Sequence, residues 1–138
     1  MMAPPLPTEL PQRRFRLTRE PPAAAEARRQ VRAALCAWQV PVDPDIAILL
    51  TSDLVTSAIM HGDGTTVTLV IRCSCGHLRV DVFYDTVPYP PMAVDEPAVT
   101  EAGHGLMLVA ALSTGWGSFR TPEGTVAYFT LVFPSVSR

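Results

Sequence analysis

The sequence has no lysine, little cysteine and no long apolar run. All 11 basic residues are arginine, which together with 14 prolines indicates a GC-rich coding sequence and not a particular chemistry. The apolar runs are far shorter than the roughly 20 residues that a membrane-spanning helix requires. The three cysteines form an odd set without a secretion signal before them, which favours reduced thiols over a disulfide framework.

Charge is balanced overall but unevenly distributed. The net charge of −2 argues against a nucleic-acid-binding domain. Residues 1–32 contain seven Arg and three Glu, a net of +4, whereas residues 33–138 contain four Arg and ten Asp or Glu, a net of −6. We expect the basic segment to be a solvated face or to contact an acidic partner, with no direct contact to nucleic acid. The segment MMAPPLPTEL lacks a signal-peptide pattern, so we expect a cytoplasmic protein without a membrane partner.

The length of 138 residues suits one domain. We expect residues 1–11 to be a flexible Pro-rich segment and residues 12–138 to form a single domain. Hydrophobic periodicity and turn residues predict a strand at 13–20, helices at 21–40 and 42–62, strands at 65–74 and 77–85, a loop at 86–102, a helix at 103–114 and a hairpin at 116–133. This order predicts an α+β fold, a two-layer sandwich whose mixed, mostly antiparallel sheet has its helices on one face.

A line of polar side chains crosses the second predicted helix, in the stretch SDLVTSAIMHG. Asp53, Ser57 and His61 recur every four residues and therefore fall within an arc of roughly 80°. The rest of this helix is apolar, so we expect it to be buried, and buried polar groups need partners. A carboxylate and a hydroxyl together suit Mg²⁺ carrying phosphates. In the alternative interpretation, Ser57 bonds back to a carbonyl, Asp53 faces solvent beside an arginine, and His61 stabilises the helix end.

Two further motifs suit an anion or a nucleotide. The GHGLM motif at 103–107 follows a long loop and opens a helix, which leaves backbone N–H groups free for an anion. Asp85 ends the strand HLRVDVFYD at the mouth of the same loop, where it could accept a hydrogen bond from a ligand amine. When each motif is taken alone, an ordinary turn is the commoner explanation. A zinc site at CSCGH is disfavoured because its cysteine spacing is too short and a second ligand pair is missing.

Taken together and in this order, four segments resemble a known family. SDLVTSAIMHG, VDVFYDTVPYPP, GHGLMLV and EGTVAYF are similar to segments of the anti-sigma factor serine/threonine kinases, in the short stand-alone form found in actinobacteria. That family shares the Bergerat ATP-binding fold with gyrase, MutL and histidine kinases. The resemblance extends over residues 13–133. It implies a regulator of transcription that uses ATP and Mg²⁺ and binds a sigma factor or an anti-sigma antagonist, with phosphorylation of the antagonist on serine.

The resemblance also assigns roles by position. Asp85 corresponds to the adenine-binding aspartate and Thr125 to its supporting threonine. The phosphates would be held at Gly103, His104, Gly105 and Leu106, beneath a lid formed by residues 86–102. His61, at the end of the polar line, would also face the cofactor. The family's members pair through the sheet edge near the N-terminal strand, which implies a homodimer.

Two positions depart from the family pattern. Asp53 stands where the family has a catalytic glutamate, and Ser57 where it has the asparagine that holds Mg²⁺. Asp is one methylene shorter than Glu, and a misplacement of about 1 Å can lower a rate by on the order of a hundredfold. A serine hydroxyl can still ligate Mg²⁺. The sequence therefore leaves two functions open, a nucleotide-dependent kinase and an interaction module of the same fold that regulates a partner without phosphotransfer.

Overall fold

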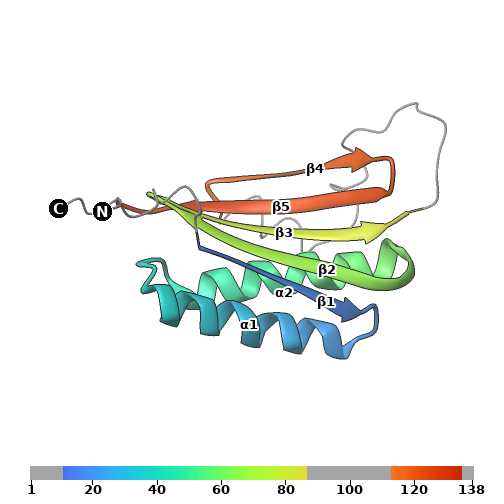
Figure 1. The fold of residues 1–138 in the computed structure, drawn as a ribbon, viewed down its shortest axis with the longest axis horizontal. Helices are drawn as coiled ribbons and strands as arrows, with labels where there is room; N and C mark the ends of the chain where they lie inside the picture. The colour runs from blue at the N-terminus through green and yellow to red at the C-terminus, as the bar shows by residue number, and fades with distance from the viewer. Residues whose placement is uncertain (1–10, 87–112, 135–138) are drawn as a thin grey trace, which may run out of the picture.

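The computed structural model describes residues 11–86 and 113–134. Within them the chain forms two helices and five strands (Figure 1). In chain order the elements are β1 (Gln12–Thr18), α1 (Pro22–Trp38), α2 (Pro44–His61), β2 (Asp63–Ser74), β3 (His77–Asp85), β4 (Gly115–Thr121) and β5 (Gly124–Val132). Each predicted helix and strand in this part of the chain is present, with ends shifted by at most two residues.

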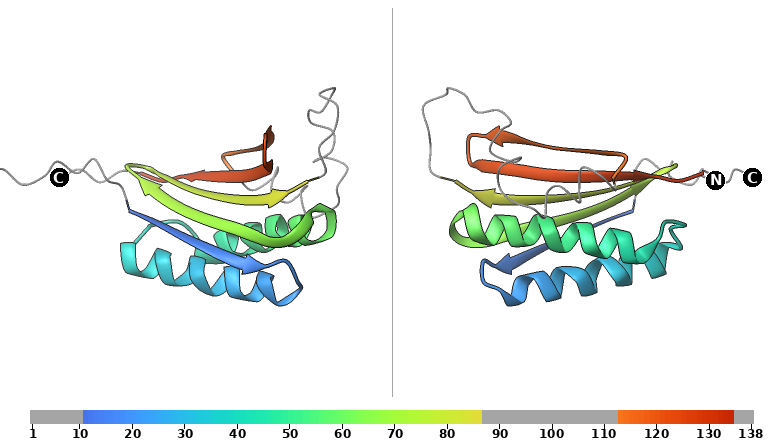
Figure 2. Two further views of the ribbon diagram at one scale, coloured as in Figure 1. Left: turned by 45° about the vertical axis from the view of Figure 1, so that its right-hand side comes forward. Right: turned by 180° about the vertical axis from the view of Figure 1, so that it is seen from behind.

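The five strands form one sheet in the order β1-β2-β3-β5-β4. Every neighbouring pair is antiparallel, so among the described strands the sheet is wholly antiparallel where a mixed sheet was predicted. Both helices lie side by side on one face, α1 nearest β1 (Figure 1, Figure 2). The α+β class and the placement of these helices on one face are therefore confirmed. Within the described residues, neither helix combines the length and apolar character that crossing a membrane requires.

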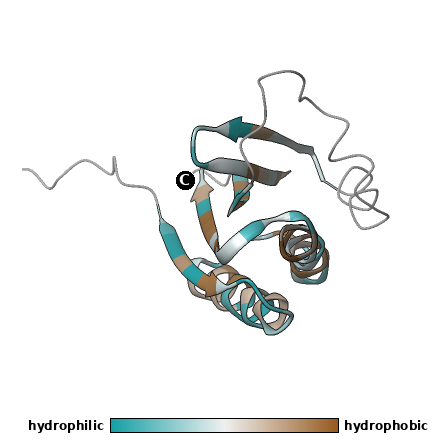
Figure 3. Ribbon diagram, turned by 90° about the vertical axis from the view of Figure 1, so that its right-hand side faces the viewer, coloured by the Kyte–Doolittle hydropathy of each residue, from teal (hydrophilic) through white to brown (hydrophobic). Residues whose placement is uncertain are grey.

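The core lies between the helices and the sheet. Alternate residues of the central strands point toward the helices and are fully buried, among them Leu69, Ile71, Val80, Val82 and Phe129. They pack against Val31 of α1 and Leu50, Leu54 and Val55 of α2. Burying an aliphatic side chain of this size stabilises a fold by about 1.5–3 kcal/mol, which is why the alternating pattern fixes each strand's face. Figure 3 shows the result, with β1 alternating in hydropathy along its length and α2 largely hydrophobic.

Helix α2 begins and ends at residues whose chemistry suits those places. The Asp43 carboxylate accepts a hydrogen bond from the Asp45 N–H at 2.9 Å, and Pro44 follows in the first turn. Gly62 ends the helix as predicted, but its φ of −86° is not left-handed. A Cβ there would lie 2.6 Å from the Ala58 carbonyl oxygen and 3.0 Å from Tyr84 Cδ2. Glycine is needed at this helix end because a side chain would collide with the last turn of α2 and would also crowd Tyr84 of β3.

Helix α1 is bounded in a similar way by its sequence. Pro21 and Pro22 stand at its start, where the missing N–H groups cost nothing. The helix ends at Trp38, and Gln39 adopts a left-handed conformation with φ 53° while its N–H bonds to the Cys36 carbonyl at 3.2 Å. Pro41 follows directly and prevents continuation.

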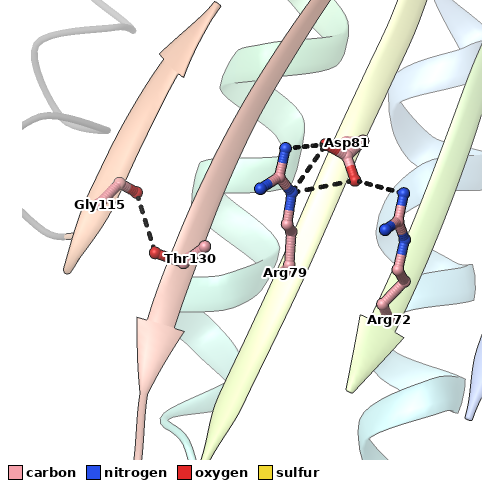
Figure 4. A network of polar contacts seen from close by, with 5 residues as sticks. All are labelled: Arg72, Arg79, Asp81, Gly115 and Thr130. Carbon is pink, nitrogen blue, oxygen red and sulfur yellow. Dashed lines mark hydrogen bonds and ion pairs between the residues drawn. The ribbon is translucent and has the colours of Figure 1, made fainter. Parts of the chain in front are cut away.

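The face of the sheet opposite the helices carries a charged network. Asp81 is only 5% exposed and accepts hydrogen bonds from Arg79 Nε at 3.0 and 3.3 Å (Figure 4). Arg72 approaches the same carboxylate at 3.5 Å from the neighbouring strand. The Arg79 guanidinium also lies 4.1 Å from the centre of the Tyr128 ring. On this side, strands β2, β3 and β5 are therefore joined through side chains as well as through backbone hydrogen bonds.

Some predicted segments lie partly or wholly outside the described residues. These are residues 1–11 apart from Pro11, the loop 86–102 apart from Thr86, and the helix 103–114 apart from Ser113 and Thr114. The last two residues are not helical, and the Thr114 N–H donates to the Thr130 carbonyl at 2.8 Å. Strand β2 begins at Asp63, earlier than predicted, because Asp63 pairs with Asp85 across an irregular register that ends at Val67.

Candidate functional site

The end of α2, the end of β3 and the start of β5 meet at one end of the sheet, on the right in Figure 1. The close approach of Gly62 to Tyr84 joins α2 to β3. The register then pairs Tyr84 with Thr125 and Asp85 with Gly124. Residues from three distant stretches of sequence therefore come together here, including several that the motifs singled out.

Asp53 points one carboxylate oxygen into the protein without a partner. Its Oδ2 atom is buried and has no hydrogen-bond donor among the described residues, and burial raises the pKa of this carboxyl. The alternative in which Asp53 faces solvent beside an arginine is wrong. Arg28, the arginine that reaches this stretch of α2, donates instead to Ser52 Oγ at 3.0 Å. Asp53 is thus an acceptor with unused capacity on a half-buried helix face.

Ser57 follows one turn later and is also half-buried. Its hydroxyl makes no hydrogen bond with any described residue, whereas the Thr51 hydroxyl bonds back to the Ala47 carbonyl at 2.8 Å. The alternative in which Ser57 bonds back to a carbonyl is therefore not observed. Thr51 makes such a bond instead. His61 is exposed in the last turn, where an imidazole suits the negative end of the helix dipole. Of the three polar residues in this line, Asp53 and Ser57 are therefore half-buried and His61 is exposed.

Asp85 and Thr125 occupy neighbouring strand positions but make no hydrogen bond to each other within the described structure. Asp85 is exposed, and its carboxylate lies over Gly64, where an added Cβ would come within 2.6 Å of Oδ2. Gly64 has a φ of +77°, so a side chain there would be strained as well as crowded. The Thr125 hydroxyl instead lies 3.3 Å from the Thr86 hydroxyl. The two residues predicted to contact adenine therefore lie at the adjoining ends of β3 and β5, with no hydrogen bond between them.

Three described residues lie close to Thr125 at these strand ends. Thr86 contacts it directly, Tyr84 is its register partner on β3, and Arg120 is its register partner on β4. Burial raises the pKa of Tyr84, and the charge of Arg120 acts against that shift. Arg120 could have been found by counting outward from the turn at TPEG, because Arg120 and Thr125 lie at matching positions of that hairpin.

Arg19 was also missed, and it ties the N-terminal strand to this end of the sheet. Its Nη1 donates to the Ile59 carbonyl at 2.6 Å, and its Nε donates to the Gly64 carbonyl at 2.8 Å. Its backbone N–H bonds to the Thr65 carbonyl at 2.8 Å. These partners are about 40 or more residues away along the chain, so no local pattern could have indicated them.

Gly103, His104, Gly105 and Leu106, together with the lid apart from Thr86, lie outside the described residues. Among the described residues, no three His, Cys, Asp or Glu side chains gather as metal ligands. A Mg²⁺ ion at this site would therefore depend on the Ser57 hydroxyl, phosphate oxygens and water, a combination of hard oxygen ligands that Mg²⁺ accepts. The hydroxyl on α2 fits such an ion.

Comparison with known proteins gives no match, either to a family model or to a curated sequence. The family resemblance therefore rests on the four motifs and their order, and the site on the geometry described above.

Proposed function

We propose that the protein binds an adenine nucleotide with Mg²⁺ between α2 and the ends of β3 and β5, and thereby regulates a protein partner in the cytoplasm. The observation that carries this proposal is the buried, unpartnered Asp53 Oδ2, one helical turn from the unbonded Ser57 hydroxyl. A buried acceptor without a donor costs free energy, so its retention on this face is explained if a ligand and its water supply the missing partners.

Each residue then has a task that its chemistry can perform. Asp85 accepts a hydrogen bond from the base amine, and Thr125 orients the base from the adjacent strand. Ser57 offers its hydroxyl to Mg²⁺, which when bound offsets the charge of the phosphates. Asp53 serves as the proton acceptor for a serine hydroxyl of the partner, and burial raises the pKa of this carboxyl, which makes it a stronger base. The resemblance to the anti-sigma factor kinases suggests a sigma factor or an anti-sigma antagonist as that partner.

A second candidate is an interaction module of the same fold that regulates its partner without phosphotransfer. One observation favours it, namely that Thr125 bonds to Thr86 while Asp85 remains exposed over Gly64. In this function the strand ends are held together by their own side chains and do not require a nucleotide.

Titration calorimetry with ATP and ADP, with and without Mg²⁺, separates these two functions. We expect Mg²⁺-dependent ATP binding that Asp85→Asn weakens by about tenfold or more, equivalent to about 1.4 kcal/mol. Asp45→Asn, an exposed carboxylate at the other end of α2, is the matched control and should bind as the native chain does. Ser57→Asn should strengthen the dependence on Mg²⁺, and Asp53→Glu should raise phosphotransfer to a serine-containing partner.

No binding at millimolar nucleotide would contradict the first function and favour the interaction module. Equal losses in Asp85→Asn and Asp45→Asn would show that the nucleotide does not occupy the end of β3.

A further inference from the structure

Strand β1 forms one edge of the sheet. Within the described residues it pairs only with β2, so its other side presents backbone N–H and C=O groups without strand partners. Such an edge can accept an added strand from another chain, which gains backbone hydrogen bonds along its whole length. Proteins often protect such edges with charged side chains, so the charges on β1 decide which chain can be accepted.

The charges on β1 are all positive. Arg14 and Arg16 are exposed, stand two positions apart and therefore share one face of the sheet. Neither forms an ion pair with any residue that the structure describes. Arg13, on the opposite face, is occupied above the Trp38 ring at 5.5 Å. A second copy of β1, the homodimer that the family resemblance implies at this edge, would bring arginines close to arginines, which is unfavourable, whereas an acidic strand would pair with them.

On the helix-covered side the same edge opens into a groove. Phe15 and Leu17 of β1 face Pro22 and Ala23 of α1 across a volume of about 450 Å³, which Arg16 and Thr18 also line. Glu20 and Glu26 also line it. The Glu26 carboxylate is held by Arg29 and by Gln30, whose Nε2 lies 2.7 Å from it. The groove therefore presents apolar side chains together with Arg16 and Thr18 from β1, and acidic side chains from its other side. Its apolar part suits an apolar side chain, and Glu20 and Glu26 disfavour an acidic one beside them.

We propose that β1 binds an extended segment of a partner protein in which acidic and apolar residues alternate. Added to the β1 edge, such a segment places its acidic side chains beside Arg14 and Arg16, and its apolar side chains in the groove beside Phe15 and Leu17. The alternation follows from strand geometry, since successive side chains point to opposite faces. This interaction does not require nucleotide binding at the other site.

A fluorescent eight-residue peptide of alternating glutamate and valine tests the proposal by anisotropy with the full chain. Two control peptides are used, one with the same residues in two blocks and one alternating lysine with valine. We expect saturable binding of the alternating acidic peptide only. The double variant Arg14→Glu, Arg16→Glu should bind the alternating acidic peptide at least about tenfold more weakly, because two attractive contacts become repulsive. The same variant should instead bind the lysine peptide.

Arg32→Glu, an exposed arginine of α1, is the matched control for Arg16→Glu and should change the affinity by less than about twofold. The proposal would be overturned if the block peptide bound as tightly as the alternating one. Equal losses of peptide affinity in Arg16→Glu and Arg32→Glu, or no binding at millimolar peptide, would also overturn it. Sedimentation of the peptide-free chain provides a further test. A dimer that the double variant dissociates would show that a second copy occupies the edge, and would also overturn it.

Discussion

Asp53 places an ionisable oxygen where neither the described residues nor solvent provide a donor. Charged groups in such positions usually reduce stability, because desolvation penalises the charged form. Natural proteins tolerate that loss where function needs the group. The residue can therefore be tested through stability alone, without any assumption about its ligand.

Asp53→Asn is expected to stabilise the unliganded protein at pH 7 by up to about 1 kcal/mol, a modest gain because the side chain is only half-buried. Burial raises the pKa of the folded-state carboxyl, so the native state binds its proton more tightly than the unfolded state does. The penalty is therefore present above the folded pKa, declines as the pH falls through it and disappears below the unfolded value of about 4.

Thermal unfolding of Asp53→Asn and the native chain at several pH values between 7 and 4 measures this difference. Asp45→Asn, whose carboxylate lies exposed in the first turn of α2, should give no gain at any pH. A gain for Asp53→Asn that stays constant down to pH 4 would show that burial of the charge is not its cause.

At the scale of elements, the end of α2 leaves no room for a side chain. The glycine there has an ordinary φ, so the reason for it lies in the space that the Ala58 carbonyl of α2 and Tyr84 of β3 leave around its Cα. This predicts a large effect from a very small substitution.

Gly62→Ala should destabilise the fold by about 1–3 kcal/mol, because the added methyl meets the Ala58 carbonyl, a backbone atom that cannot rotate away. Urea unfolding monitored by circular dichroism gives the value. Gly115→Ala is the control, since the methyl there meets the Thr130 hydroxyl, a side-chain atom that can move. Equal losses in the two variants would contradict the role assigned to the contact with α2.

The elements could be predicted because their signals are local. Asp43 and Pro44 indicated the start of α2, and alternation predicted β3 to the residue. The strand order could not be predicted, because β3 pairs with β5 across a long connection that carries no pairing signal. The candidate site shows the same difference between local signals and contacts of distant segments. Helical spacing placed Asp53 beside Ser57, but the contact of Thr86 with Thr125 depends on two strands meeting.

At the scale of the whole molecule, the sheet separates two environments. One face is closed by helices and is apolar, and the other carries the Asp81 network (Figure 4). The guanidinium groups of Arg72 and Arg79 both contact the Asp81 carboxylate. This one carboxylate therefore balances two positive charges on the face opposite the helices.

Asp81→Ala is expected to destabilise the protein by about 1–3 kcal/mol, since it leaves Arg72 and Arg79 as neighbouring like charges without a counterion. Arg72→Ala should cost less than about 1 kcal/mol, because that side chain is half-exposed and its contact is longer. Guanidinium chloride would mask the charges, so urea is the denaturant of choice. A larger loss for Arg72→Ala than for Asp81→Ala would contradict this ranking.

The hydrogen bonds of Arg19 have a consequence for how the molecule moves. One guanidinium holds the carbonyls of Ile59 and Gly64, and the same residue's N–H holds Thr65. The chain leaving β1 is thereby pinned to the last turn of α2 and to the beginning of β2. A displacement of this chain must either stretch these bonds or carry the end of α2 with it. Movement of the edge strand is therefore coupled to the last turn of the helix that presents Asp53.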